Sequence, residues 1–315
     1  MVFSSFELPF YVQLLVYFLL AALALLRIMR YNSNEMRILV AFFIAGMVIF
    51  WVEGVGPNNI VILAVGLLIF NGLLGSHSDG IDSMFHVALS IAYMVLTYEI
   101  GVAFIAQAML LGMLGSITSL KEPRFRISTK TIELKRDVLH IVAGALLMLC
   151  FIFLQNAEAI TILLLVILIG LFGIRYAETN KRGALYRYAY TFERSGARLG
   201  HGALWLGLGS LIAIAFLNNT YVLLVFSATF IADPLATIVG IALGGPKLPY
   251  NKSKSVVGSA VYFVVAAIIG SIFVGVWALP LALAAAMIEG ARLGMDDNFT
   301  VSLGLTLILF AAQVA

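Results

Sequence analysis

An aspartate and a proline stand together inside a long apolar segment of this 315-residue chain. Asp233 lies about eleven residues before Gly244, which is about 16 Å along a continuous helix. An aspartate that deep in a membrane helix costs about 2.5–3.5 kcal/mol, so it needs a function or a partner. Pro234 cannot donate to a helix ladder and disfavours helical geometry before it, which predicts that Asp233 caps a new half-helix. The alternative is a proline kink with the carboxylate paired to a neighbour.

The predicted half-helix runs to about Leu243 and presents small residues below Asp233. Thr237, Gly240 and Gly244 share one face, which leaves space for a ligand. Its N-terminus would carry a partial positive charge inside the membrane. Broken helices are tolerated at such depth only against protein or a watery cavity, so we expect a cavity here.

The loop after this segment has the composition of an anion site. It contains Lys247, Lys252 and Lys254, and it also contains Gly245, Asn251 and Ser255, with Gly258 and Ser259 opening the next helix. Lysines, hydroxyls and glycine-flanked amides at a helix N-terminus bind phosphate, which is the chemistry that a triphosphate needs. The spacing is not that of a Walker loop. An ordinary basic loop is the alternative.

Further carboxylates follow near the C-terminus. Glu289 lies near the end of an apolar helix, and Asp296, Asp297 and Asn298 come soon after it. Mg²⁺ prefers carboxylate and phosphate oxygen ligands, so these residues with Asp233 predict a site for Mg²⁺ or another divalent cation. Capping of the last helix is the alternative for the three consecutive residues.

Arg136 and His140 are four residues apart and share a helix face. The guanidinium of Arg136 is suited to holding a phosphate. His140 is either a proton acceptor or a hydrogen-bonded core residue.

The composition indicates that membrane helices position these side chains. Apolar residues make up 62% of the chain and charged residues 11%, which excludes a soluble globular domain. We therefore predict an all-α polytopic membrane protein, and we expect the bilayer but no nucleic acid as a partner. An oligomer is compatible with the sequence.

The apolar runs predict about twelve transmembrane helices. All nineteen Lys and Arg fall in alternate loops, which places both termini outside and the active site on the cytoplasmic side. Residues 1–120 would hold the first five helices, whose role is unassigned, and residues 121–315 would form the catalytic domain. The predicted helices are 10–27, 37–52, 58–74, 84–98, 100–119, 137–155, 158–176, 200–217, 220–243, 257–276, 278–293 and 299–314.

The stretch DPLATIVGIALGGPKLPYNKSKSVVGS, residues 233–259, resembles the core motif of membrane lipid kinases that use CTP. This family comprises dolichol kinases, phytol kinases and CTP-dependent diacylglycerol kinases. LPYNKSKS and the DDNFTVSL at 296–303 are most like phytol and polyprenol kinases, and Arg136 with His140 matches a further family element. Ala232, Pro234 and Asp137 depart from the family's usual residues.

The resemblance implies transfer of the γ-phosphate of CTP to the hydroxyl of a long isoprenoid alcohol, such as dolichol, polyprenol or phytol. Lys252, Lys254 and Ser255 would hold the triphosphate, the carboxylates would hold Mg²⁺, and Asp233 would be a metal ligand or the base. One alternative is a phosphatidate cytidylyltransferase, in which a lipid phosphate attacks the α-phosphorus of CTP. A second is a secondary transporter, because a broken helix with midplane carboxylates is also typical of transporters.

Overall fold

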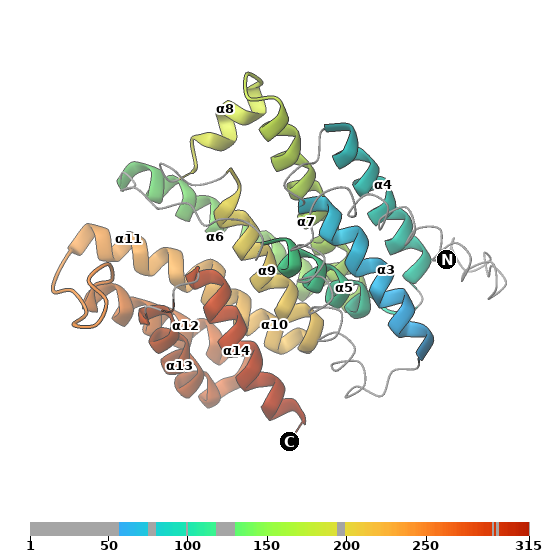
Figure 1. Cartoon of the computed structure of the whole chain (residues 1–315). Helices are drawn as coiled ribbons and strands as arrows, with labels where there is room; N and C mark the ends of the chain where they lie inside the picture. The colour runs from blue at the N-terminus through green and yellow to red at the C-terminus, as the bar shows by residue number, and fades with distance from the viewer. Residues whose placement is uncertain are drawn as a thin grey trace. The chain divides into compact units, whose positions relative to one another are not determined.

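The computed structural model describes residues 57–74, 80–98, 100–117, 130–193, 199–291, 293 and 296–314. The described chain is helical throughout and contains no β-strand (Figure 1). One isolated antiparallel bridge joins Lys247 and Ser255. The prediction of an all-α fold is therefore confirmed for the described residues, whereas the predicted helices 10–27 and 37–52 lie outside them.

The chain divides into two compact units, of which the first holds three complete described helices. These are α3 (Pro57–Leu74), α4 (Gly80–Thr97) and α5 (Val102–Ile117), and residues 171–179 belong to the same unit. Helix α3 packs on both others, and a β-carbon at Gly112 would lie 2.7 Å from that of Phe70. Gly101, with φ +133°, precedes α5, and the helices predicted at 84–98 and 100–119 are two separate helices, α4 and α5.

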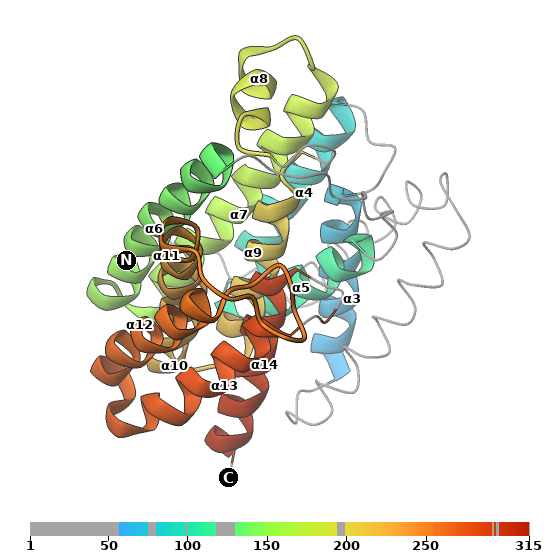
Figure 2. The same cartoon turned by 90° about the vertical axis from the view of Figure 1, so that its left-hand side faces the viewer.

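The second unit contains every predicted site residue. Its elements are α6 (Lys130–Phe153), residues 156–170 of α7 (Asn156–Thr179), α8 (Ala184–Tyr190), α9 (His201–Phe216), α10 (Asn219–Phe226), η1 (Ser227–Ala232), α11 (Asp233–Leu243), α12 (Val256–Val274), η2 (Gly275–Trp277), α13 (Ala278–Gly290) and α14 (Asp297–Val314). Within it α12 packs between α11 and α13, and α14 packs between α13 and α9 (Figures 1 and 2). The ends of these helices meet around Asp233.

The predicted break at Asp233 is wrong, because the chain from 219 to 243 stays helical. Asp233 has helical angles, φ −64° and ψ −50°, and the preceding six residues form the π-helix η1. The amide of Asp233 donates to the carbonyl of Ala228, five residues earlier. This wider turn accommodates the residue without an amide donor at Pro234, so a π-turn replaces the expected half-helix cap.

Two close approaches hold the helices around Asp233. A β-carbon at Gly144 of α6 would overlap the side chain of Phe230 in η1. A β-carbon at Gly240 of α11 would lie 3.4 Å from the Cα of Gly258 in α12. Small residues let membrane helices approach closely, so these glycines set the distances of α6 and α12 from the helix that carries Asp233.

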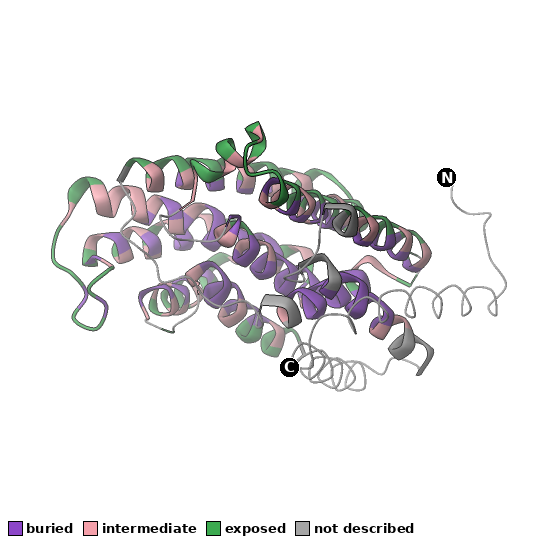
Figure 3. Cartoon of the chain, turned by 45° about the horizontal axis from the view of Figure 1, so that its top comes forward, coloured by how far each residue is buried: buried purple, intermediate pink, exposed green. Residues whose placement is uncertain are grey.

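Four stretches of the described chain are long and apolar enough to cross a membrane. They are Thr131–Phe153, Asn156–Thr179, Asn219–Leu243 and Val256–Gly290. Many large apolar residues of these helices are exposed. Figure 3 shows exposed residues in green along the helices. Because α6 begins at Lys130 and not at 137, Lys130, Lys135 and Arg136 lie within a helix and not in the predicted loop. The short helix α8 lies where a loop was expected.

Candidate functional site

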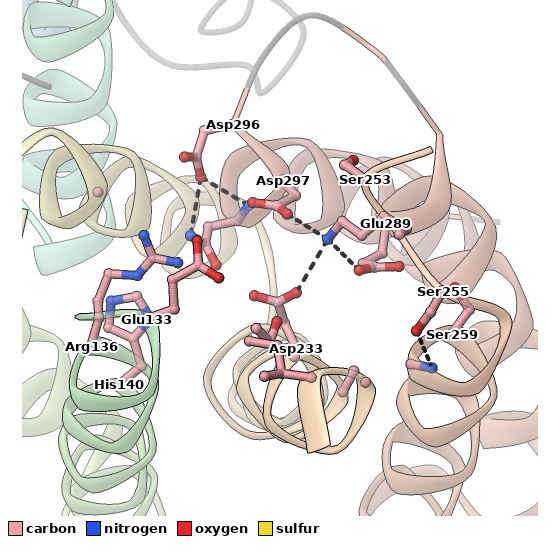
Figure 4. Close-up of a pocket in the computed structure, with 18 of the residues that line it drawn as sticks. Glu133, Arg136, His140, Asp233, Ser253, Ser255, Ser259, Glu289, Asp296 and Asp297 are labelled. Atoms are coloured by element: carbon pink, nitrogen blue, oxygen red, sulfur yellow. Dashed lines mark hydrogen bonds and ion pairs between the residues drawn. The ribbon is translucent and has the colours of Figure 1, made fainter. Parts of the chain in front are cut away.

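A cavity of about 770 Å³ opens between α6, α11 and the starts of α9, α12 and α14. Most of the predicted site residues line it (Figure 4). Those are Arg136, His140, Asp233, Gly240, Gly244, Lys247, Lys254, Ser255, Gly258, Ser259, Glu289, Asp296, Asp297 and Asn298. Gly245, Asn251 and Lys252 are not among its lining residues.

Three carboxylates from three helices converge at the cavity (Figure 4). Asp233 is the first residue of α11, Glu289 is next to the last residue of α13, and Asp297 is the first residue of α14. One oxygen from each lies within 4.8 Å of the others. The fold thus brings together residues that are 56 and 64 positions apart from Asp233 in the sequence.

The ammonium of Lys254 lies among these carboxylates. It donates to Oε1 of Glu289 and, at 2.7 Å, to Oδ2 of Asp297, and it lies 3.9 Å from Oδ1 of Asp233. Burial alone would lower the pKa of Lys254, but Asp297, Asp233 and Glu289 together raise that pKa well above its ordinary value. Lys254 is therefore an ammonium ion at neutral pH.

The cluster is not satisfied by this lysine alone. Oδ1 of Asp233 and Oε2 of Glu289 are buried and accept no hydrogen bond. The Glu289 side chain is only 4% exposed. Three carboxylates against one ammonium leave a formal charge of −2, so the chemistry of this donor set favours an additional or a stronger cation.

Asp296 and Asn298 form the start of α14, which is the capping alternative raised from the sequence. Oδ1 of Asp296 accepts hydrogen bonds from the backbone amide of Asn298 at 3.1 Å and from its side-chain amide at 3.0 Å. The carbonyl of Asp296 accepts from the amide of Thr300. Both residues line the cavity, but the group of three converging carboxylates contains Asp297 and not Asp296.

The lysine-rich loop between α11 and α12 is held by its own hydrogen bonds. Oγ of Ser255 accepts from the amide of Gly258 and caps α12. The side-chain amide of Asn251 donates to the carbonyl of Gly290 at 3.0 Å, which ties the loop to the end of α13. Lys252, next to Asn251 in the loop, is exposed. The structure therefore gives Ser255 and Asn251 roles in positioning Lys254.

The predicted glycines allow a close helix contact and a chain turn in the same region. Gly240 and Gly258 line the cavity, but they also form the contact between α11 and α12. Gly244 and Gly245 have φ values of +68° and +107°, which non-glycine residues rarely adopt, so they let the chain turn out of α11. Oγ of Ser259 is buried without a hydrogen-bond partner at the edge of the cavity.

The opposite wall is formed by α6, which carries Glu133, Arg136 and His140 (Figure 4). The guanidinium of Arg136 lies 3.7 Å from the carboxylate of Asp137. The Nε atom of Arg136 is buried and donates no hydrogen bond. The wall facing the carboxylates thus offers one guanidinium, part of whose charge Asp137 balances.

Sequence reasoning missed or left without a role several residues at the cavity. Glu133 lies one turn before Arg136 on the same face, and it would have been found had the start of α6 been placed correctly. Glu193 accepts a hydrogen bond from the amide of Gly200 at 2.7 Å. His201 accepts one through Nε2 from the indole of Trp205. No spacing in the sequence indicated that the start of α9 borders this cavity.

No protein-family model, no curated protein and no solved structure matches this chain. The resemblance to lipid kinases that use CTP therefore stays a prediction.

Proposed function

We propose that this chain is a membrane-embedded phosphotransferase that moves the γ-phosphate of CTP to the hydroxyl of a long isoprenoid alcohol. The observation that carries the proposal is the convergence of Asp233, Glu289 and Asp297 in a cavity that cationic side chains also line. Phosphoryl transfer depends mainly on positioning and on neutralising phosphate charge, so it needs this combination of groups. Twelve spans, with both termini outside and a cytoplasmic cavity, complete the proposal.

The carboxylates fit a divalent cation. Asp233, Glu289 and Asp297 would hold Mg²⁺, which prefers such oxygen ligands and supplies charge neutralisation for phosphate oxygens when bound. The oxygens of Asp233 and Glu289 that accept no hydrogen bond, and the formal charge of −2, support this assignment. Two roles were predicted for Asp233, metal ligand and catalytic base. Its place in the cluster favours the role of metal ligand.

Cationic side chains on both sides of the cavity would receive the triphosphate. Lys247 and Lys254 come from the loop before α12, and Arg136 comes from α6. Without these cations the carboxylates would repel a nucleotide, because the triphosphate is also negatively charged. Lys252 lies outside the cavity. Lys247 therefore takes the triphosphate-binding role that the resemblance implied for Lys252.

An apolar row on α6 favours a lipid as the acceptor. Leu139 lines the cavity and is 49% exposed. Val142, Leu146, Leu149 and Phe153 continue the row at helical spacing, and all are exposed. An alcohol whose hydroxyl reaches the cavity could leave its chain along this row, in the bilayer.

The transporter alternative loses one of the features that favoured it, the helix broken at Asp233. Residues 219–243 form one continuous helical stretch. The cytidylyltransferase alternative uses the same groups, and the position of CTP cleavage separates it from the kinase. The choice of CTP and of an isoprenoid alcohol derives from the resemblance of residues 233–259.

The test uses the full-length protein in liposomes with Mg²⁺, a polyprenol or phytol, and phosphatidic acid. CTP is labelled at the γ-phosphate in one reaction and at the α-phosphate in another. We expect γ-label in the alcohol and none from the α-position, with the Glu289→Gln variant inactive. Transfer of α-label into lipid would overturn the kinase in favour of a cytidylyltransferase, and no transfer by folded protein would overturn both.

A further inference from the structure

The cation position formed by the three carboxylates is already occupied by a side chain of the protein. Lys254 Nζ donates to Glu289 and Asp297 and lies 3.9 Å from Asp233. The ligand atoms of these residues lie within 4.8 Å of one another, so the ammonium takes the space that a shared metal ion would need.

An ammonium and a divalent ion cannot share this space. Mg²⁺ binds its oxygen ligands at about 2.0–2.1 Å, so an ion held by the same oxygens would lie in contact with Nζ. Two positive centres at that separation repel strongly in a partly buried site. The side chain of Lys254 must therefore leave before all three carboxylates can hold the metal.

The structure allows this movement without unfolding the loop. The carbonyl of Lys254 accepts from the amide of Leu248 at 3.0 Å, and its amide donates to the carbonyl of Asn251 at 3.2 Å. Ser255, the next residue, caps α12. The backbone is thus fixed, whereas the side chain borders the cavity and is 24% exposed. Rotation of a flexible lysine side chain is enough to move its charge into the cavity.

We propose that Lys254 is an internal counter-ion that occupies the divalent-cation site in the resting protein and is exchanged for the metal when polyphosphate binds. This inference extends the proposed function, because it assumes that the cavity binds a metal and a polyphosphate anion. The released ammonium pairs with the phosphate oxygens, and the metal takes its place among the carboxylates. The exchange gives the carboxylates the larger positive charge of the metal and moves the ammonium to the phosphates.

The exchange makes metal binding and anion binding cooperative. Without an anion, the metal competes with Lys254 and binds weakly. With an anion in the cavity, Lys254 has another partner, so the metal binds more tightly. By linkage, the metal raises the affinity for the anion by the same factor, and couplings of this kind are typically about 5- to 150-fold.

The first test measures binding of Mn²⁺ alone to metal-stripped, full-length protein by electron paramagnetic resonance. We expect the Lys254→Met variant to bind Mn²⁺ about tenfold more tightly than the wild type, because the competing ammonium is absent. Lys252→Met is the matched control: it removes the same charge from the same loop, outside the cavity, and should stay within about twofold. Inorganic tripolyphosphate should raise the Mn²⁺ affinity of the wild type more than that of Lys254→Met. Unchanged or weaker binding by a folded Lys254→Met protein would overturn the inference.

A second measurement uses the wild type and does not depend on folding of the variant. Amine acetylation is quantified by mass spectrometry at Lys254 and at the exposed Lys252, with a chelator and with saturating Mn²⁺ in the absence of an anion. We expect Lys254 to be protected in the chelator and to become more reactive relative to Lys252 when Mn²⁺ displaces its ammonium, because no phosphate is present to pair with it. A ratio that does not change would overturn the inference.

These outcomes are separate from those of the kinase assay. Tighter Mn²⁺ binding by Lys254→Met without any lipid phosphorylation would support the exchange and reject the kinase. Lipid phosphorylation by the wild type with unchanged Mn²⁺ affinity in Lys254→Met would do the reverse.

Discussion

The side chain of Phe230 fills the space beside Gly144, so that α6 touches the π-helix directly before Asp233. This contact sets how far the α6 wall, with Arg136 and His140, lies from the carboxylates. Both residues lie N-terminal to Gly144 on the same helix, so a shift at Gly144 carries the whole wall with it.

The Gly144→Ala substitution should therefore impair both stability and activity. The added methyl would overlap Phe230, and overpacking of this kind costs about 1–3 kcal/mol. Thermal unfolding in detergent and phosphate transfer in liposomes measure the two effects. Gly170→Ala is the matched control, because no atom lies within 4 Å of its added β-carbon, and alanine favours a helix by about 1 kcal/mol over glycine. Equal behaviour of the two variants would show that the contact does not position α6.

Neighbouring aspartates should differ in their effect on metal binding. Asp297→Asn removes one of the three converging carboxylates, and it should lower Mn²⁺ affinity and activity by about 100-fold or more, above the effect of a residue that only orients a ligand. Asp296→Asn keeps a side-chain oxygen that can accept from Asn298, so its loss should be within about tenfold. Mn²⁺ titration of both proteins measures this ratio. A larger loss for Asp296→Asn would move the metal site to the residue that caps α14.

Much of the site could be predicted from residue types in short stretches of sequence. Asp233 was predicted as a site residue because a charged group inside an apolar helix is costly. Glu289 and Asp297 were predicted because Mg²⁺ prefers carboxylate oxygens. The loop lysines were predicted as phosphate ligands because lysine, serine and glycine together favour phosphate binding. The convergence of the three carboxylates requires the packing of α11, α12, α13 and α14, and no single stretch of sequence contains this packing.

The wrong or incomplete predictions have local physical causes. Pro234 indicated a break, but a π-turn satisfies the amide of Asp233 five residues back and keeps the helix continuous. Asn251 and Ser255 have the side chains of phosphate ligands, yet Asn251 donates to the carbonyl of Gly290 and Ser255 accepts from the amide of Gly258. Four described stretches meet the length and hydropathy that a span needs, and the count of twelve spans stays a prediction.

The raised pKa of Lys254 predicts how stability depends on pH. Because its carboxylate partners hold the proton in the folded state, the stabilisation from Lys254 is complete below its ordinary pKa of about 10.4. It is lost as the pH rises through the higher folded value. The difference in melting temperature between wild type and Lys254→Met, measured without metal, should therefore be constant from about pH 7 to 9 and should shrink only above about pH 10.4. A difference that already falls between pH 7 and 9 would mean that Lys254 is not held as an ammonium by the cluster.

The apolar row on α6 predicts a separation between the two substrates. Leu139→Asn replaces an apolar side chain at the cavity, and lost contact with an alkyl chain should raise the KM for the isoprenoid alcohol about tenfold. The KM for CTP should not change, because the carboxylates and cationic side chains are intact. Leu134→Asn is the matched control, since Leu134 is a similarly exposed leucine of α6 that does not line the cavity. Steady-state kinetics in mixed micelles give both constants. An equal rise for both variants would assign the effect to insertion of α6 in the bilayer and not to the acceptor.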